Sequence, residues 1–152
     1  MSLGTAKPVV DPNSRGFHRW LERVAQEIQM PWKDFTPGTF TWNGGGSVSN
    51  VDVDLARFQY FPLTKRVDLR MTVNADVSGV GAITSVQVAL PIPAKVVGVA
   101  TDNLIGMFKA SNSMGFVTLV DKDTLIAGLD GLAAFPAGTG LSHSFLLSYQ
   151  AN

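Results

Sequence analysis

The sequence contains no cysteine and little charge, and both shortages limit what the protein can do. Without cysteine there are no disulfides, no thiolate metal sites and no cysteine nucleophile. The lack of cysteine also suits a protein made in a reducing cytoplasm. Charged residues make up 16% of the chain, against about 25% in an average soluble domain. Acidic and basic residues number 12 each, so the basic excess typical of a nucleic-acid-binding protein is missing and no nucleic-acid partner is expected.

Long apolar runs and targeting signals are missing as well. No run approaches the roughly 18 apolar residues of a membrane helix, so membrane insertion is not expected. No apolar stretch follows the first four residues, which have the character of an expression scar, and no secretion signal is visible. A chain of 152 residues fits one domain with a core of its own.

What the chain does contain is apolar surface that must be covered. Hydrophobic residues make up 45% of the sequence, and there are 15 glycines. With so few charges, this composition predicts apolar surface that is hidden by self-association. Closed cyclic symmetry is the usual way to hide such a surface, and we expect a homotrimer.

The N-terminal part of the chain predicts one amphipathic helix. Residues 1–13 are expected to be a flexible lead-in, and residues 14–30 show helical spacing, with Asn13 or Ser14 able to cap the start and Pro31 ending it. This apolar stripe must be buried, either by three copies around an axis or against the β-domain of the same or a neighbouring chain. We expect docking at the base of the β-domain within a trimer. The stripe consists of Phe17, Trp20, Leu21, Val24 and Ile28.

In residues 31–152 the apolar residues no longer recur at helical spacing but at every second position, which is typical of strands. Apolar and polar residues alternate from Val67 to Val77, which predicts a long strand with one buried face. Val51, Val53 and Leu55 form a shorter run of the same kind, with one buried face expected. The apolar phase then slips, because Phe58 and Tyr60 lie on the opposite parity, and this predicts a β-bulge near Ala56. The fold class expected is mainly β, an antiparallel, jelly-roll-like β-sandwich with one short N-terminal α-helix. Further strands are expected at Val86–Ile92, Lys95–Ala100, Ile105–Ala110, Gly115–Val120, Thr124–Ala127 and Ser142–Gln150.

Few residues are candidates for catalysis. The two histidines, His18 and His143, are expected to be polar surface residues, and no persuasive Ser-His-Asp set is present. Asp52 and Asp54 lie two apart on a strand and share a face with Asn50, a pattern that suits Ca²⁺ binding or glycoside hydrolysis. A solvated polar strand face is the simpler interpretation. We therefore predict no catalytic residue, no metal site and no cofactor.

The three tryptophans have different expected roles. Trp20 is expected to pack on the helix, and Trp32 is expected to seal the junction between helix and sheet. Trp42 precedes a run of three glycines and is the best candidate for stacking on a sugar, with packing at the core or its rim as the alternative.

Five short motifs follow one another from Trp32 to Asn152. In this order they resemble the C-terminal head domain of phage tail-fibre and tail-like proteins. Thr64 stands where the turn of that family has glycine. The motifs are Trp32 followed by Phe35-Thr36-Pro37, then Ala56-Arg57-Phe58, Leu63-Thr64-Lys65 before the long alternating strand, Leu90 to Ala94, and Leu147-Ser148-Tyr149.

The resemblance implies an antiparallel β-sandwich that trimerises, sits at a fibre tip and contacts the host surface without catalytic residues. It predicts a structural or receptor-binding module of a virion, made in the host cytoplasm, whose partners are its own copies and a host-surface glycan or protein. Two alternatives remain open. One is a lectin-like carbohydrate-binding β-sandwich, and the less favoured one is a β-sandwich glycosidase or lyase.

Overall fold

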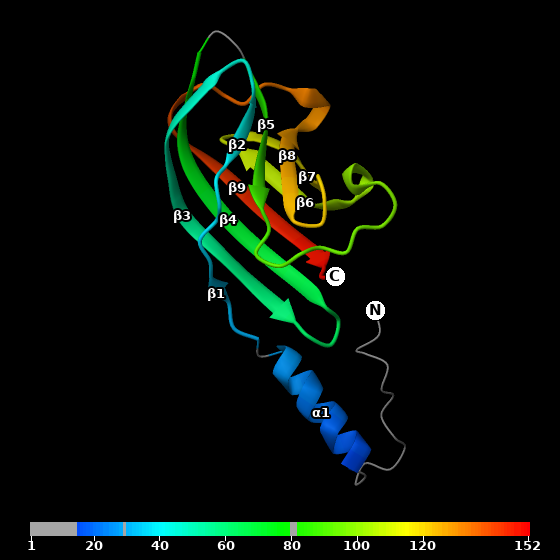
Figure 1. Ribbon diagram of the computed structural model, residues 1–152. Coiled ribbons are helices and arrows are strands. Elements are labelled where there is room, and N and C mark those ends of the chain that lie inside the picture. Colours follow the sequence, from blue (N-terminus) through cyan, green and yellow to red (C-terminus); the bar gives the residue numbers. More distant parts are fainter. Residues whose placement is uncertain (1–14, 29, 80–81) are drawn as a thin grey trace.

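In the part of the chain that the structure describes, one α-helix is followed by nine strands. Figure 1 shows their arrangement. The computed structural model describes residues 15–28, 30–79 and 82–152, so the lead-in and the cap at Asn13 or Ser14 lie outside the described residues. The helix α1 spans Arg15–Ile28. The strands are β1 (Lys33–Asp34), β2 (Thr41–Gly44), β3 (Ser47–Phe61), β4 (Arg66–Ser78), β5 (Ile83–Ala89), β6 (Leu104–Ala110), β7 (Ser113–Leu119), β8 (Thr124–Leu129) and β9 (Gly138–Gln150), and two short 3₁₀ turns are η1 (Ala100–Asp102) and η2 (Asp130–Leu132).

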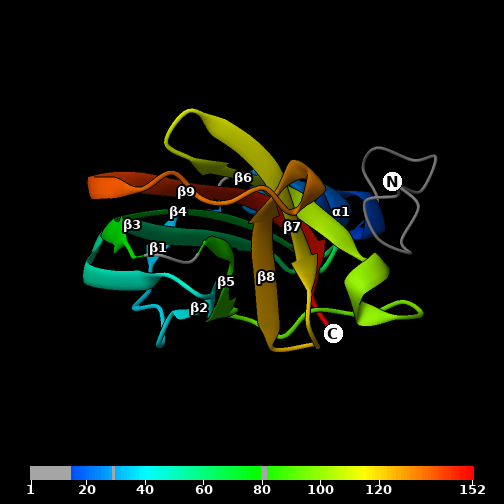
Figure 2. The ribbon, with the colours of Figure 1, turned by 90° about the horizontal axis from the view of Figure 1, so that it is seen from above.

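All nine strands belong to one antiparallel sheet in the order β1-β3-β4-β9-β6-β7-β8-β5-β2. The sheet curls into a half-barrel, so that β5 and β8 cross over the concave face of β4 and β9 (Figures 1 and 2). The predicted mainly β, antiparallel fold with one helix near the N-terminus is confirmed. The predicted sandwich is not confirmed, because one continuous sheet encloses the core.

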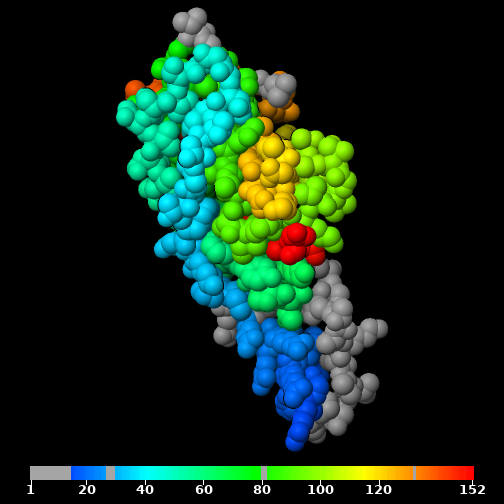
Figure 3. Space-filling model, in the orientation of Figure 1, coloured from blue at the N-terminus to red at the C-terminus, as the bar shows by residue number. Residues whose placement is uncertain are grey.

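The two edge strands, β1 and β2, are neighbours in the chain. Residues 35–40 connect them and run along the side of the β-domain, as the light-blue to cyan segment of Figure 3 shows. At one end of the half-barrel the chain bends from β2 into β3 beside the end of β4 and the start of β5. Gly44 pairs with Ile83 there, Ser47 pairs with Ser78, and the amide of Gly45 donates to the carbonyl of Ala82 at 3.0 Å.

The concave face of the sheet forms the core. The strand predicted at residues 67–77 is confirmed as β4, and its alternate residues from Val67 to Val77 are at most 4% exposed. Because side chains alternate across a strand, the other β4 residues point outward. Strands β5 to β9 contribute facing side chains, among them Val86, Val88, Phe108, Val117, Leu119, Leu125, Phe145 and Leu147.

The strand β3 departs from regular alternation. Its pairing with β4 shifts register between Ser49 and Asp52 and again between Val53 and Leu55, slightly before the bulge predicted near Ala56. Val51 and Val53 are 41% and 37% exposed, so the expectation that they form a buried face is wrong. The physical reason is that β3 lies next to the edge of the sheet. Its neighbour on the side away from β4 is β1, a strand of two residues that pairs with Arg57 and Phe58.

The strand predicted at Lys95–Ala100 does not form. The chain instead makes an irregular loop that ends in η1, and Val97 and Val99 are 68% and 63% exposed. Asn103 stabilises this loop: its side chain accepts a hydrogen bond from the amide of Val97 at 3.0 Å and donates to the carbonyls of Val97 and Val99 at 2.9 and 2.7 Å. Side-chain bonds of this kind offer the backbone an alternative to strand pairing. The other predicted strands are present as β5 to β9 with shifted ends.

Two glycines allow the sheet to curl tightly at β6, β7 and β8. A Cβ atom on Gly115 would lie 2.0 Å from the carbonyl oxygen of Gly128 and 2.6 Å from the Cα of Leu129. A Cβ atom on Gly106 would lie 2.3 Å from the carbonyl oxygen of Leu146. These contacts are with backbone atoms, so the side chain can be accommodated only if the strands move apart.

We predict that Gly115→Ala destabilises the fold by at least about 1–3 kcal/mol, the usual cost of forcing an extra methyl group into a packed site. The matched control is Gly38→Ala, whose new methyl group would meet only the Cβ of Ala89 at 3.9 Å. Chemical denaturation of both variants measures the difference. Equal unfolding free energies for Gly115→Ala and the wild type would contradict the role given to this close strand approach.

Candidate functional site

His143 is a core residue, and its prediction as a surface histidine is wrong. It is 0% exposed and lies on β9 with the same alternation as Phe145. Aromatic rings surround it: the ring centroids of Trp42, Phe135 and Phe108 lie 5.1, 5.8 and 6.2 Å from its own. This apolar setting gives His143 no access to a substrate in solution.

Burial also fixes the charge state of His143. Desolvation lowers the pKa of the ring, and nearby backbone groups of Val73 and Leu141 offset this only in part. Neither ring nitrogen has a partner with good hydrogen-bond geometry among the described residues. The neutral ring is therefore the stable form within the core. The other histidine, His18, is an exposed residue of α1, as predicted.

Trp42 belongs to the same aromatic cluster. Its ring is half-buried and packs against Phe40 at 6.4 Å and Phe135 at 6.2 Å, in addition to His143. Its indole nitrogen is buried and has no hydrogen-bond partner among the residues that the structure describes. The structure thus places Trp42 in packing contact with the core, which is the alternative given for this residue above.

The paired carboxylates of β3 do not form the regular face that was expected. Asp52 pairs with Asn74, whereas Asp54 is the extra residue at the second register shift. Asn50 has a positive φ of 50° and donates to Asp76 at 2.6 Å. Within residues 15–28, 30–79 and 82–152, no group of three or more His, Asp or Glu residues is placed to hold a metal ion.

The helix α1 lies beyond the end of the sheet and forms a lobe of its own (Figures 1 and 3). Trp20 and Val24 are half-buried, and Leu21 is 42% exposed. The apolar residues of α1 that the structure describes are not among those packed against the core. The side chain of Ile28 lies outside the described residues. Among the helices that the structure describes, none has the length and apolar character needed to span a bilayer.

The convex face of the sheet carries an unexpected group of apolar side chains, here called the outer patch. It extends over three adjacent strands, because Met107 on β6 pairs with Phe116 on β7 and with Leu146 on β9. Each of these residues is about half exposed. A contiguous apolar group of this kind marks an interaction surface. The outer patch consists of Leu104 (62% exposed), Met107 (49%), Met114 (49%), Phe116 (49%) and Leu146 (55%).

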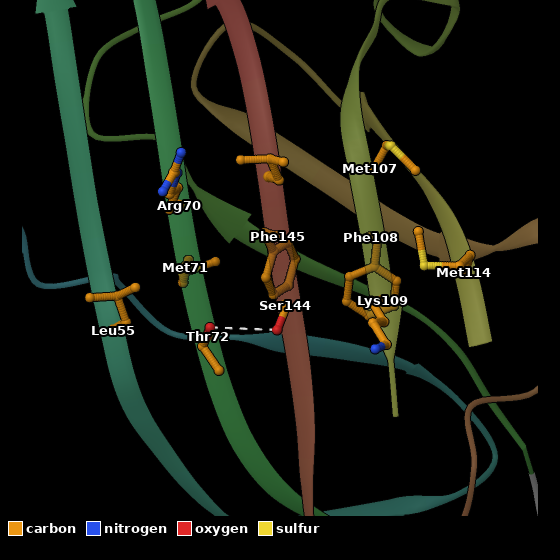
Figure 4. Close-up of a pocket in the computed structure, with 11 residues that line it drawn as sticks. Leu55, Arg70, Met71, Thr72, Met107, Phe108, Lys109, Met114, Ser144 and Phe145 are labelled. Atoms are coloured by element: carbon orange, nitrogen blue, oxygen red, sulfur yellow. Dashed lines mark hydrogen bonds between the residues drawn. The ribbon is translucent and has the colours of Figure 1, made fainter. Parts of the chain in front are cut away.

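A groove of about 470 Å³ opens on the same convex face, next to the outer patch (Figure 4). Its floor is β4, β9 and β6, and the hydroxyls of Thr72 and Ser144 face each other across β4 and β9 at 3.5 Å. Leu55 borders one side, and Met107 and Met114 border the other. Arg70 and Lys109 add two cations. The groove, here called the outer groove, is lined by Leu55, Arg70, Thr72, Met107, Lys109, Met114, Ser144 and Leu146 together with the core residues Met71, Phe108 and Phe145.

A second hollow of about 510 Å³ continues the outer groove toward α1, and the two share Arg70 and Leu146. Trp32 lines this hollow, and the guanidinium of Arg70 lies 5.0 Å from the centre of its ring. Gln59 donates to the carbonyl of Met30 at 2.6 Å. Trp32 thus sits where the helix connects to the sheet, as predicted, and the chain between α1 and β1 is held against β3 and β4.

Sequence reasoning missed the outer patch, although a signal was present. Met107, Phe116 and Leu146 occupy the outward positions of strands whose inward positions are also apolar. Apolar residues of both alternation phases within one strand indicate that both faces are covered in the working protein.

The lowered pKa of His143 predicts a specific pH dependence of stability. The unfolded chain binds a proton at His143 near pH 6.5, whereas the folded core does not. The free energy of unfolding should therefore be constant above about pH 6.5 and should fall, by up to about 1.4 kcal/mol per pH unit, as the pH decreases below it. Denaturation between about pH 7.5 and 5.5 measures this slope.

Two variants identify the group responsible. His143→Leu should remove the slope, because no buried imidazole then resists protonation, and His18→Gln should keep it, because His18 is exposed. A slope that persists in His143→Leu would show that another group causes the acid sensitivity.

Comparison of the chain with protein-family models, with curated proteins and with solved structures finds no match. Function is therefore inferred from the described residues, and above all from the outer patch and the outer groove.

Proposed function

We propose that this chain is a non-catalytic, self-assembling β-module of a phage tail fibre or a related virion appendage, which works as a homotrimer and helps to attach the virion to its host. The observation that carries the proposal is the outer patch. Its five half-exposed apolar residues lie on a rigid sheet, where they need a protein surface to cover them. The motifs between Trp32 and Asn152 supply the link to tail fibres.

A catalytic role has little support from the geometry. His143 is enclosed by aromatic rings, and Asp52 and Asp54 are separated by an irregular stretch of β3. Assembly, in contrast, explains why a chain with 16% charged residues has apolar side chains on its convex face.

The virion assignment has a test of its own. Tail or baseplate genes beside the coding sequence would support it, and neighbours that all encode unrelated enzymes would contradict it.

Light scattering coupled to size exclusion tests the assembly. The wild type should have about three times the chain mass of 16.2 kDa. Phe116→Glu should yield folded chains of 16.2 kDa, because its carboxylate, beside Met107 and Gly128 in the outer patch, would be buried without a partner in the assembly. Val97→Glu, on a loop where the native side chain is 68% exposed, is the matched control and should leave the trimer intact. A wild type that is monomeric at micromolar concentration would rule out the proposed assembly.

A further inference from the structure

We propose that α1 of one copy lies in the outer groove of a neighbouring copy and covers part of its outer patch. The contact would pack Trp20, Leu21 and Val24 of the helix against Met107 and Leu146 of the neighbour. The inference depends on the self-assembly proposed above and names the surfaces that meet in it.

The helix is suited to such a contact. It has 14 residues, which is close to the lower limit for a stable isolated helix in water. Most helices of this length are stabilised by packing an apolar face, yet the described apolar residues of α1 are not packed against the core of their own chain. Leu21 is 42% exposed and lies three residues before Val24, so that these two side chains are neighbours on one side of the helix.

The outer groove has a suitable width and lining. Its floor spans β4, β9 and β6, and two strand spacings of about 4.8 Å give a width of about 10 Å. A helix with its side chains has a diameter of about 10–12 Å. Met107 and Met114 border the groove, and methionine side chains adapt to bulky partners such as tryptophan.

The chain between α1 and β1 favours a neighbour's groove over the chain's own. The bond from Gln59 to the carbonyl of Met30 and the stacking of Arg70 on Trp32 hold this connection against the convex face. From there the helix points away from the sheet (Figure 1). To enter its own groove, the helix would have to fold back and break these contacts. A helix that docks on the next copy makes a head-to-tail contact, and three such contacts can close a ring.

Chemical cross-linking tests the contact, and the absence of native cysteine makes it specific. One chain carries Leu21→Cys, and a second chain with a longer tag carries Met107→Cys. The two are co-expressed and treated with a short bis-maleimide. We expect a cross-linked product that contains one chain of each size. Replacing Met107→Cys by Val97→Cys, on the exposed loop before β6, should abolish that product.

Each other result of the cross-linking experiment would point to a different arrangement of the chains. Cross-links between two Leu21→Cys chains alone would place the helices around a common axis and overturn the inference. A chain that carries both cysteines and is cross-linked only within itself would place α1 in its own groove, which also overturns it. If mixed trimers form without any product between Leu21→Cys and Met107→Cys, the inference fails while the proposed assembly stands. If no oligomer forms at all, the proposed assembly itself fails.

Discussion

A single curled sheet can bury only its concave face, and this constraint shapes the rest of the protein. The alternate residues of β4 from Val67 to Val77 are enclosed by the strands that cross over them, and the aromatic cluster around His143 lies within the same core. The curl depends on backbone contacts too close for a side chain, at Gly106 and Gly115. On the convex face, Trp32 packs over Arg70, whereas the residues of the outer patch stay about half exposed.

The proposed function rests on what lies on that convex face. Met107, Phe116 and Leu146 would be polar on a sheet that faces water permanently. The same chain carries a short amphipathic helix that is held clear of its own core. We propose that the outer patch and the apolar side of α1, where Leu21 is exposed, are complementary surfaces that a symmetric assembly covers together. This interpretation requires no catalytic chemistry and agrees with the low charge of the sequence.

The sequence predicted those parts of the fold that depend on alternation over many residues. The strand β4 was predictable because its apolar and polar residues alternate without interruption from Val67 to Val77. The strand expected at Lys95–Ala100 is a loop because Asn103, further along the chain, bonds to its backbone. His143 was predictable in principle, since it shares the alternation phase of Phe145 and Tyr149, but its polarity suggested the surface. The outer groove was not predictable, because it depends on the order β4-β9-β6, which joins strands far apart in the chain.

The central claim is that another copy covers the outer patch, and the oxidation of the native methionines tests it most directly. Met107 and Met114 are each 49% exposed in the single chain, whereas Met71 is 2% exposed and serves as the buried reference. Peroxide treatment followed by mass spectrometry gives the rate of sulfoxide formation at each residue. In the assembled protein, Met107 and Met114 should oxidise nearly as slowly as Met71, and they should become reactive when dilution separates the copies. Rapid oxidation of both residues in the assembled protein would contradict the claim.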